Sequence, residues 1–103
     1  MLSDRIHILP EEWSSTSKLF VALGDEQRQR ILLAFEPGER LNITQIVSTS
    51  ALSRTAVNHH LKVLRESGAL ASEKVGKEVY FWIDKDYIID ALQRVLTHVK
   101  EQT

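Results

Sequence analysis

The stretch that decides the fold is Ser53-Arg-Thr-Ala-Val-Asn-His-His-Leu-Lys-Val-Leu-Arg-Glu-Ser-Gly68. Its apolar residues Val57, Leu61 and Leu64 recur four and three positions apart, which is the spacing of one helix face. Ser53 is a favourable N-cap and Gly68 a favourable stop. The opposite face is polar and basic, and it comprises Arg54, Thr55, Asn58, His59, Lys62 and Arg65. The sequence therefore predicts an amphipathic helix that ends at about residue 67.

A shorter helix precedes this one. Asn42-Ile-Thr-Gln45 has the pattern of a capping box, in which an N-cap side chain is paired with a glutamine three residues later. The helix that it starts extends to about Ser48, and a brief polar connection, 49–52, leads to Ser53. Two helices joined by a short turn, the second amphipathic with a basic face, are a candidate helix-turn-helix, which is a DNA-binding motif.

A hairpin follows the two helices. Residues 70–75 and 78–83 read as strands, and the second has the β-branched and aromatic composition that strands prefer. Gly76-Lys77 between them forms a two-residue turn of the Gly-X kind. We therefore expect a two-stranded wing. Trp82 is predicted to shield the base of this wing, and the alternative is that its indole forms the aromatic wall of a small-molecule pocket.

Three further helices complete the predicted fold, at about 13–23, 25–35 and 85–101. Gly24 suits a left-handed stop to the first, while Asp25 and Asp84 are N-caps for the other two. The prediction is a single domain over residues 1–103, mainly α with a small two-stranded β wing. Its elements follow the winged helix-turn-helix order α-α-α-α-β-β-α.

Composition argues against several classes of function. The chain has 103 residues, 43% of them hydrophobic and 26% charged, as in an ordinary globular domain. It contains no cysteine, so disulfides, thiolate metal sites and cysteine nucleophiles are excluded. No apolar run approaches the roughly 18 residues of a membrane span, and the N-terminus lacks the apolar core of a signal peptide. We expect a cytoplasmic protein with no membrane partner. Without a glycine-elbowed serine or a phosphate-binding glycine loop, we expect no enzyme.

Charge is distributed unevenly along the chain. The whole sequence carries a net charge of −1 at pH 7, which does not indicate a nucleic-acid partner. Residues 53–77 nevertheless carry net +3, whereas residues 1–52 and 78–103 each carry net −2. A local basic block provides the electrostatic footprint that binding to phosphate requires. The alternative is that these charges merely solvate a helix face.

Several stretches together resemble a known family. They are Leu23-Gly-Asp-Glu-Gln-Arg28, Arg30-Ile-Leu, Leu52 to Gly68, and Gly76-Lys-Glu-Val-Tyr-Phe81. In these stretches the chain resembles the ArsR/SmtB family of bacterial winged-helix repressors, over about residues 15–98. The resemblance implies a homodimer that binds double-stranded palindromic operator DNA and releases it when an effector binds. It leaves the effector unknown.

The resemblance also implies where a metal would bind. Asn42 and Thr44 stand at the two positions where many members carry a Cys-x-Cys pair. Other members use an Asp-x-His and His-x-x-His pattern on the last helix, of which only His98 matches. We therefore expect no metal site and no cofactor. The alternatives are a metal-responsive repressor with an atypical site at His98 and its acidic neighbours, and a winged helix used as a protein-interaction module.

The predicted DNA-binding residues are Ser53, Arg54, Thr55, Asn58, His59, Lys62, Lys74 and Lys77. Ser53 caps the recognition helix, whose N-terminal amides can bind phosphate. The polar residues of the first turns are expected to reach base edges or nearby phosphates, and Arg54 can pair bidentately with guanine. Lys62 is expected to contact the DNA backbone, and the two wing lysines to lie along phosphates or enter the minor groove. His60 is predicted to pack against the domain or the wing.

The predicted dimer interface comprises Trp13, Phe20, Ile88, Leu92, Val95 and Val99. The last four of these recur at intervals of four, three and four residues, which is a heptad-like seam. One small domain cannot fully cover such a seam, and exposed apolar stripes mark interfaces. We therefore expect the terminal helices to hold two copies together.

Overall fold

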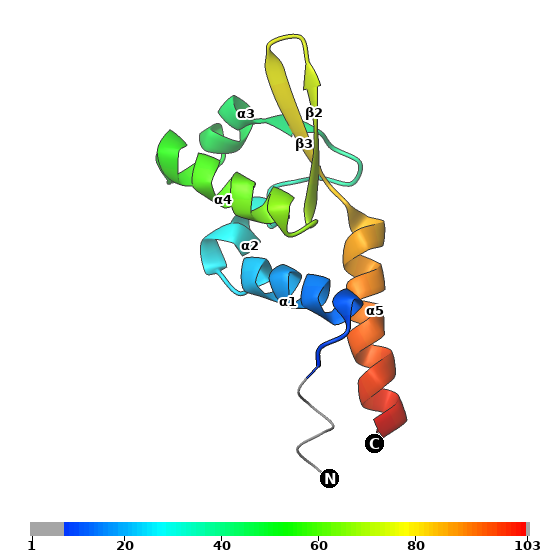
Figure 1. Cartoon of the computed structure of the whole chain (residues 1–103). Helices are drawn as coiled ribbons and strands as arrows, with labels where there is room; N and C mark the ends of the chain where they lie inside the picture. The colour runs from blue at the N-terminus through cyan, green and yellow to red at the C-terminus, as the bar shows by residue number, and fades with distance from the viewer. Residues whose placement is uncertain (1–7, 103) are drawn as a thin grey trace.

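The computed structural model describes residues 8–102, and Figure 1 shows the arrangement of their elements. In chain order these are α1 (Glu11–Leu23), α2 (Glu26–Leu33), β1 (Leu41–Asn42), α3 (Ile43–Ser48), α4 (Arg54–Glu66), β2 (Leu70–Val75), β3 (Glu78–Ile83) and α5 (Lys85–Gln102). This confirms the predicted winged helix-turn-helix order, with one added strand. The first seven residues and the last of the expected domain, 1–103, lie outside the described residues.

The helices begin at the predicted capping residues. At the start of α3, the amide of Gln45 donates to Asn42 Oδ1, and the amide of Asn42 donates to Gln45 Oε1, each at 2.9 Å. At the start of α4, Ser53 Oγ accepts from the amide of Ala56 at 3.2 Å. Asp25 accepts from two amides of α2 in the same way. Each cap gives a partner to amides that have none inside the helix, so these local signals fix where the helices start.

The end of α1 differs from the prediction. A left-handed stop at Gly24 is wrong, because this residue has φ −80° and ψ 6°. Its amide donates to Val21 O at 3.3 Å, so the helix ends in a tight turn. Asp25 is extended, with φ −113° and ψ 128°, and it leads the chain directly into α2. The chain therefore turns from α1 into α2 at the extended Asp25, without a left-handed glycine.

The core forms where α4 meets the other helices. Val57, Leu61 and Leu64 of α4 are buried, together with Leu19 of α1 and Ile46 of α3. Removing such apolar side chains from water is the main favourable contribution to folding. It also leaves the opposite side of α4 facing solvent.

The sheet has three strands, whereas the sequence predicts two. β2 and β3 are the predicted wing strands, and they pair antiparallel from Leu70↔Ile83 to Val75↔Glu78. β1 pairs with the other edge of β3, where Leu41 lies opposite Phe81. A strand of two residues is too short to show alternation, and its second residue caps α3, so the sequence signal there is that of a helix start. The base of the wing is thereby joined to the start of the helix-turn-helix.

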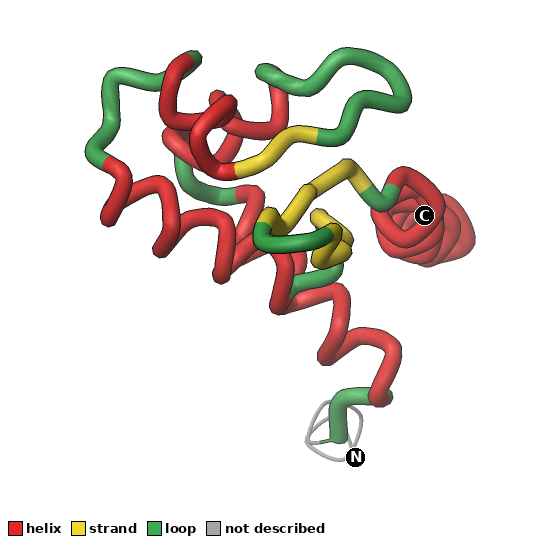
Figure 2. The backbone as a smooth tube through the Cα atoms, turned by 90° about the horizontal axis from the view of Figure 1, so that it is seen from above, coloured by secondary structure: helices red, strands yellow, loops and turns green. Residues whose placement is uncertain are grey.

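Helix α5 leaves the sheet and passes beside α1, away from the hairpin (Figure 1); Figure 2 looks along its axis. Arg94 Nη1 donates to Thr16 Oγ1 of α1 at 3.0 Å. The rings of Trp13 and His98 meet edge to face, with centroids 5.4 Å apart. The wing tip and the end of α5 thus lie at opposite ends of a molecule 55 Å long. Within residues 8–102, every helix is too short or too polar to span a membrane.

Replacing Gly68 by alanine is expected to destabilise the fold. Gly68 has φ +88°, and a Cβ there would overlap the ring of Tyr87 on α5. Gly38 is a matched control, because its φ is +73° but a Cβ there meets nothing within 4 Å. Gly38→Ala should lower the free energy of unfolding by about 1–2 kcal/mol, the usual cost of left-handed backbone, and Gly68→Ala by more. Denaturant unfolding followed by circular dichroism measures both. Equal losses would show that the Tyr87 ring moves aside without cost.

Candidate nucleic-acid interface

Helices α3 and α4 form the predicted helix-turn-helix. In the connection between them, the amide of Leu52 donates to Ser50 Oγ at 2.9 Å. Arg54 Nη1 donates to Thr44 Oγ1 at 3.2 Å, which links the first turn of α4 to α3. The two helices are therefore fastened both through the turn and across it, so the outer face of α4 has a defined orientation.

The outer face of α4 and the wing carry the predicted DNA-binding residues. All eight are exposed: Ser53, Arg54, Thr55, Asn58, His59, Lys62, Lys74 and Lys77. Three of the four predicted base-reading residues carry neutral side chains or a histidine, whereas the wing residues are lysines. The structure leaves each of them accessible, and their contact with DNA stays a prediction.

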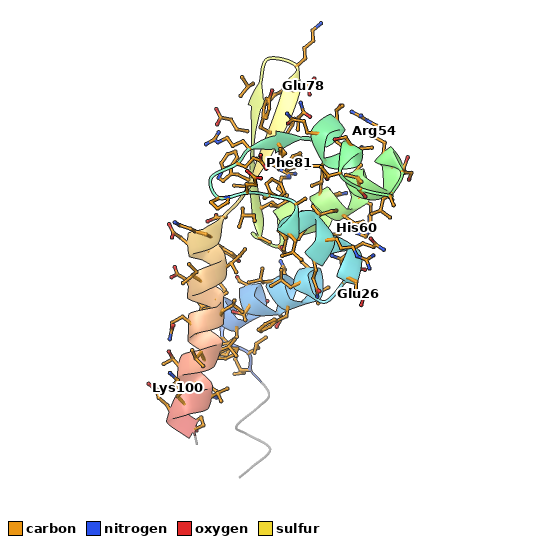
Figure 3. The ribbon with its side chains drawn as sticks, turned by 180° about the vertical axis from the view of Figure 1, so that it is seen from behind. Glu26, Arg54, His60, Glu78, Phe81 and Lys100 are labelled. Atoms are coloured by element: carbon orange, nitrogen blue, oxygen red, sulfur yellow. The ribbon has the colours of Figure 1, made fainter. Side chains whose placement is uncertain are left out.

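A groove of about 620 Å³ lies between α4 and the wing. Its lining comprises Ile43, Arg54, Asn58, Arg65, Ser72, Lys74, Lys77, Glu78, Val79 and Phe81. Four of these residues are cationic and one is acidic, so the lining has a net positive charge. In Figure 3, Arg54 lies on the helix, across from Phe81 and Glu78 on the wing. A positive groove of this kind attracts a polyanionic backbone.

The cations of the groove are not neutralised by the protein. Among residues 8–102, the ion pair is Arg40–Glu73, at 3.0 Å, and it lies outside the groove. The groove cations Arg54, Arg65, Lys74 and Lys77 form no ion pair with any described residue. They are therefore available to neutralise phosphates, and doing so would release the counterions that DNA condenses.

Arg65 is a groove residue that the predicted list of DNA contacts omits. It shares with Arg54 and Asn58 the side of α4 that faces the wing. The predicted contacts Thr55 and His59 do not line the groove, so α4 presents two sets of polar residues rather than one. Positions separated by four and then seven residues lie on one side of a helix, and this period applied to Arg54 would have identified Arg65.

The predicted dimer residues differ in their environments. The exposed ones are Phe20, Leu92 and Val99, and the half-buried ones are Trp13, Ile88 and Val95. Ile88 packs against the core of its own chain. Ile89 and Leu96, which the prediction omits, are 56% and 46% exposed. The exposed apolar stripe of α5 is therefore 89, 92, 96 and 99, which shares only its second and fourth positions with the predicted seam.

The positions that the family resemblance links to metal have other contacts here. Asn42 caps α3, and Thr44 accepts from Arg54. His98 packs against Trp13. Nowhere in the described part of the chain do three His, Cys, Asp or Glu side chains come together as metal ligands could.

Trp82 lies at the base of the wing beneath an arginine. The guanidinium carbon of Arg40 is 3.9 Å from the centroid of the Trp82 ring. Arg40 also pairs with Glu73 on β2. A cation–π contact and an ion pair on one side chain thus fasten the loop before β1 to both wing strands. One face of the indole is covered by protein, and a cavity of about 460 Å³ lies beside the residue.

The fold and the groove define a winged helix-turn-helix protein. The family of bacterial regulatory proteins named arsR matches residues 25–71. The cadmium resistance transcriptional regulatory protein CadC of Listeria innocua is 32% identical over 79 residues, which cover 77% of this chain and 66% of that protein. A transcriptional repressor SmtB homolog of Synechocystis is 27% identical over 82% of this chain, and this chain spans slightly less than two thirds of it, 64%. The chain belongs to the ArsR/SmtB family of regulators.

Solved structures share the fold. An ArsR-like transcriptional regulator from Rhodococcus superposes with a TM-score of 0.77 at 24% identity, over 87% of this chain and 83% of that chain. Most of the fold described above therefore recurs in this solved structure.

Arg65→Ala is expected to weaken binding to duplex DNA of any sequence. Losing this groove cation removes one phosphate contact per chain, so the slope of log K against log salt should become shallower by about one per chain. Lys100→Ala is the control, because Lys100 lies on α5 at the end opposite the wing (Figure 3). Fluorescence anisotropy of a random duplex across a salt series measures both variants. An unchanged slope for Arg65→Ala would remove Arg65 from the interface.

Proposed function

We propose that this protein is a dimeric, non-catalytic transcription regulator of the repressor type, which binds double-stranded operator DNA in the cytoplasm. The observation that carries the proposal is the groove of unpaired cations between α4 and the wing, beside the exposed polar face of α4. The names of the relatives support it, since they are a transcriptional regulatory protein and a transcriptional repressor. We propose no metal or cofactor, because the residues at the family's cysteine positions cap a helix or accept from Arg54.

Recognition helix α4 would enter the major groove with its N-terminal turns toward the bases. Arg54, Thr55, Asn58 and His59 occupy those turns and would reach base edges, while Ser53 would place the helix N-terminus at a phosphate. The lysines of the wing, with Lys62 and Arg65 on α4, would contact the backbone. Backbone contacts set affinity and register, and base contacts set sequence preference.

A second copy would cover the apolar stripe of α5. Ile89, Leu92, Leu96 and Val99 are each at least 43% exposed, and Phe20 of the neighbouring α1 is 44% exposed. Large apolar side chains that recur along one helix face mark an interface. Two copies related by a twofold axis would present two recognition helices to half-sites about 34 Å apart, as helix-turn-helix dimers do.

We expect Arg54→Ala and Lys77→Ala to weaken DNA binding in different ways. Arginine at the helix start can pair bidentately with guanine, which contributes roughly 1–3 kcal/mol of discrimination. Its loss should weaken operator binding much more than binding to random DNA. Lys77 lies at the wing tip, where an ammonium acts as a point charge on phosphate, so its loss should weaken both about equally. Loss of Lys77 should also make the salt slope shallower by about two contacts per dimer.

The operator for this comparison comes from genomic fragments that the purified wild-type protein selects. Both variants are then measured on operator and random duplexes across a salt series. Equal losses on the two DNAs for Arg54→Ala would make Arg54 a phosphate contact and leave sequence reading to Thr55, Asn58 and His59. Failure of the wild-type protein to select any fragment would contradict the proposed function and favour a protein-interaction module.

Leu92→Asp is expected to separate the dimer. A carboxylate at the proposed interface would be buried without a partner, at a cost of several kcal/mol. Leu33→Asp is the matched control, because Leu33 is an exposed leucine of α2, 84% accessible and outside the α5 stripe. Sedimentation velocity should show monomers only for Leu92→Asp. A Leu92→Asp protein that sediments as a dimer would place the interface elsewhere.

A further inference from the structure

Arg28 of α2 is bonded to two other helices, α1 and α4, through one guanidinium group. Its Nε donates to Ala22 O at 2.8 Å and its Nη2 to Val21 O at 3.2 Å, at the C-terminal end of α1. Its Nη1 lies 3.3 Å from Nδ1 of His60 on α4. Its own amide donates to the capping carboxylate of Asp25. All three side-chain nitrogens are therefore engaged, and each holds a different backbone or side-chain atom.

The bond to His60 joins the recognition helix to α1 and α2. Among residues 8–102, it is the side-chain hydrogen bond that connects α4 to either of those helices. The apolar core also packs α4 against them, but apolar contacts constrain direction less than a fork of hydrogen bonds does. Figure 3 shows His60 on the side of α4 that faces α2, away from Arg54 and the wing. The polar residues of α4 thus divide into those that face the proposed DNA site and His60, which anchors the helix.

The bond requires a neutral His60. Arginine stays protonated and only donates, so Nδ1 must carry a lone pair and the ring proton must sit on Nε2. Burial lowers the pKa of His60 from 6.5; Asp25 acts to raise it, while Arg28 and His59 lower it further. The amide of Arg28 holds the pKa of Asp25 below its usual value, so this carboxylate stays ionised nearby. A protonated His60 would lose its acceptor atom and place a second positive charge beside Arg28.

We infer that Arg28 is a positioning residue for the recognition helix, which it fixes relative to α1 through neutral His60. The inference rests on the proposed function, in which α4 reads DNA and α1 lies beside the dimer stripe. It goes beyond that function by assigning operator recognition a determinant that does not touch DNA. Protonation of His60 releases α4 from Arg28, while the core keeps α4 folded. As the pH falls, operator recognition is therefore lost before the protein unfolds.

The test compares operator with random DNA for wild type, Arg28→Lys, His60→Gln and His59→Gln. Operator fragments come from selection by the wild-type protein. The ratio of the two affinities is measured by anisotropy from about pH 7.5 down to about pH 4.5, because the pKa of His60 lies below the 6.5 of an ordinary histidine. His60→Gln keeps an acceptor but cannot bind a proton, and His59→Gln removes the exposed neighbouring histidine. Circular dichroism at each pH verifies that every variant is folded.

For wild type, the ratio of operator to random affinity should fall about three- to tenfold at the acid end. A change of this size corresponds to the net contribution of one hydrogen bond. His60→Gln should show a flat ratio, and His59→Gln should keep the fall. Arg28→Lys, which keeps the charge but loses the fork, should show a lower ratio at every pH. A fall in His60→Gln equal to that in wild type, or an undiminished ratio in Arg28→Lys, would overturn the inference. Selection of no fragment by wild type would instead overturn the proposed function itself.

Discussion

Burial of one face of α4 is the constraint on which the interface depends. Val57, Leu61 and Leu64 are at most 1% exposed, and they leave α4 only one rotation about its own axis. In that rotation, Arg54 and Arg65 face the wing. The same three side chains that stabilise the core therefore set the direction of the cations in the groove. A substitution in the core would alter DNA binding even where no DNA contact is lost.

Local signals made most of the fold predictable from the sequence. A cap depends on residues three positions apart, as at Asn42 and Gln45, so the helix starts could be placed without knowledge of tertiary structure. Strand β1 could not, because its two residues become a strand only through their partners on β3. The prediction of a left-handed Gly24 was wrong because the extended backbone of Asp25, the next residue, leads the chain into α2. The determining information in both cases lies in neighbouring structure rather than in the residue type.

The apolar stripe of α5 shows the same limit for the candidate site. Its sequence allows two apolar series with heptad-like spacing, 88-92-95-99 and 89-92-96-99. Only the packing of Ile88 against its own core decides that the second series is the exposed one. Arg65 differs, because the helical period alone places it with Arg54, and the sequence was sufficient to find it.

Three arginines hold the DNA-facing elements in place, and two of them, Arg28 and Arg40, use the planar geometry of a guanidinium. Arg54 bonds α4 to α3, Arg28 bonds α4 to α1, and Arg40 covers Trp82 while pairing with Glu73. A lysine ammonium could not stack on an indole in the same planar way or donate in a fixed fork.

The net charge of −1 is a poor guide to the DNA binding of this protein, because part of its positive charge organises structure and part lines the groove. Helices α1 and α5, at the other end, together carry net −1, so the field of DNA would attract the groove and turn the α5 end outward. The salt dependence of binding should accordingly follow the number of groove cations rather than the charge of the whole chain.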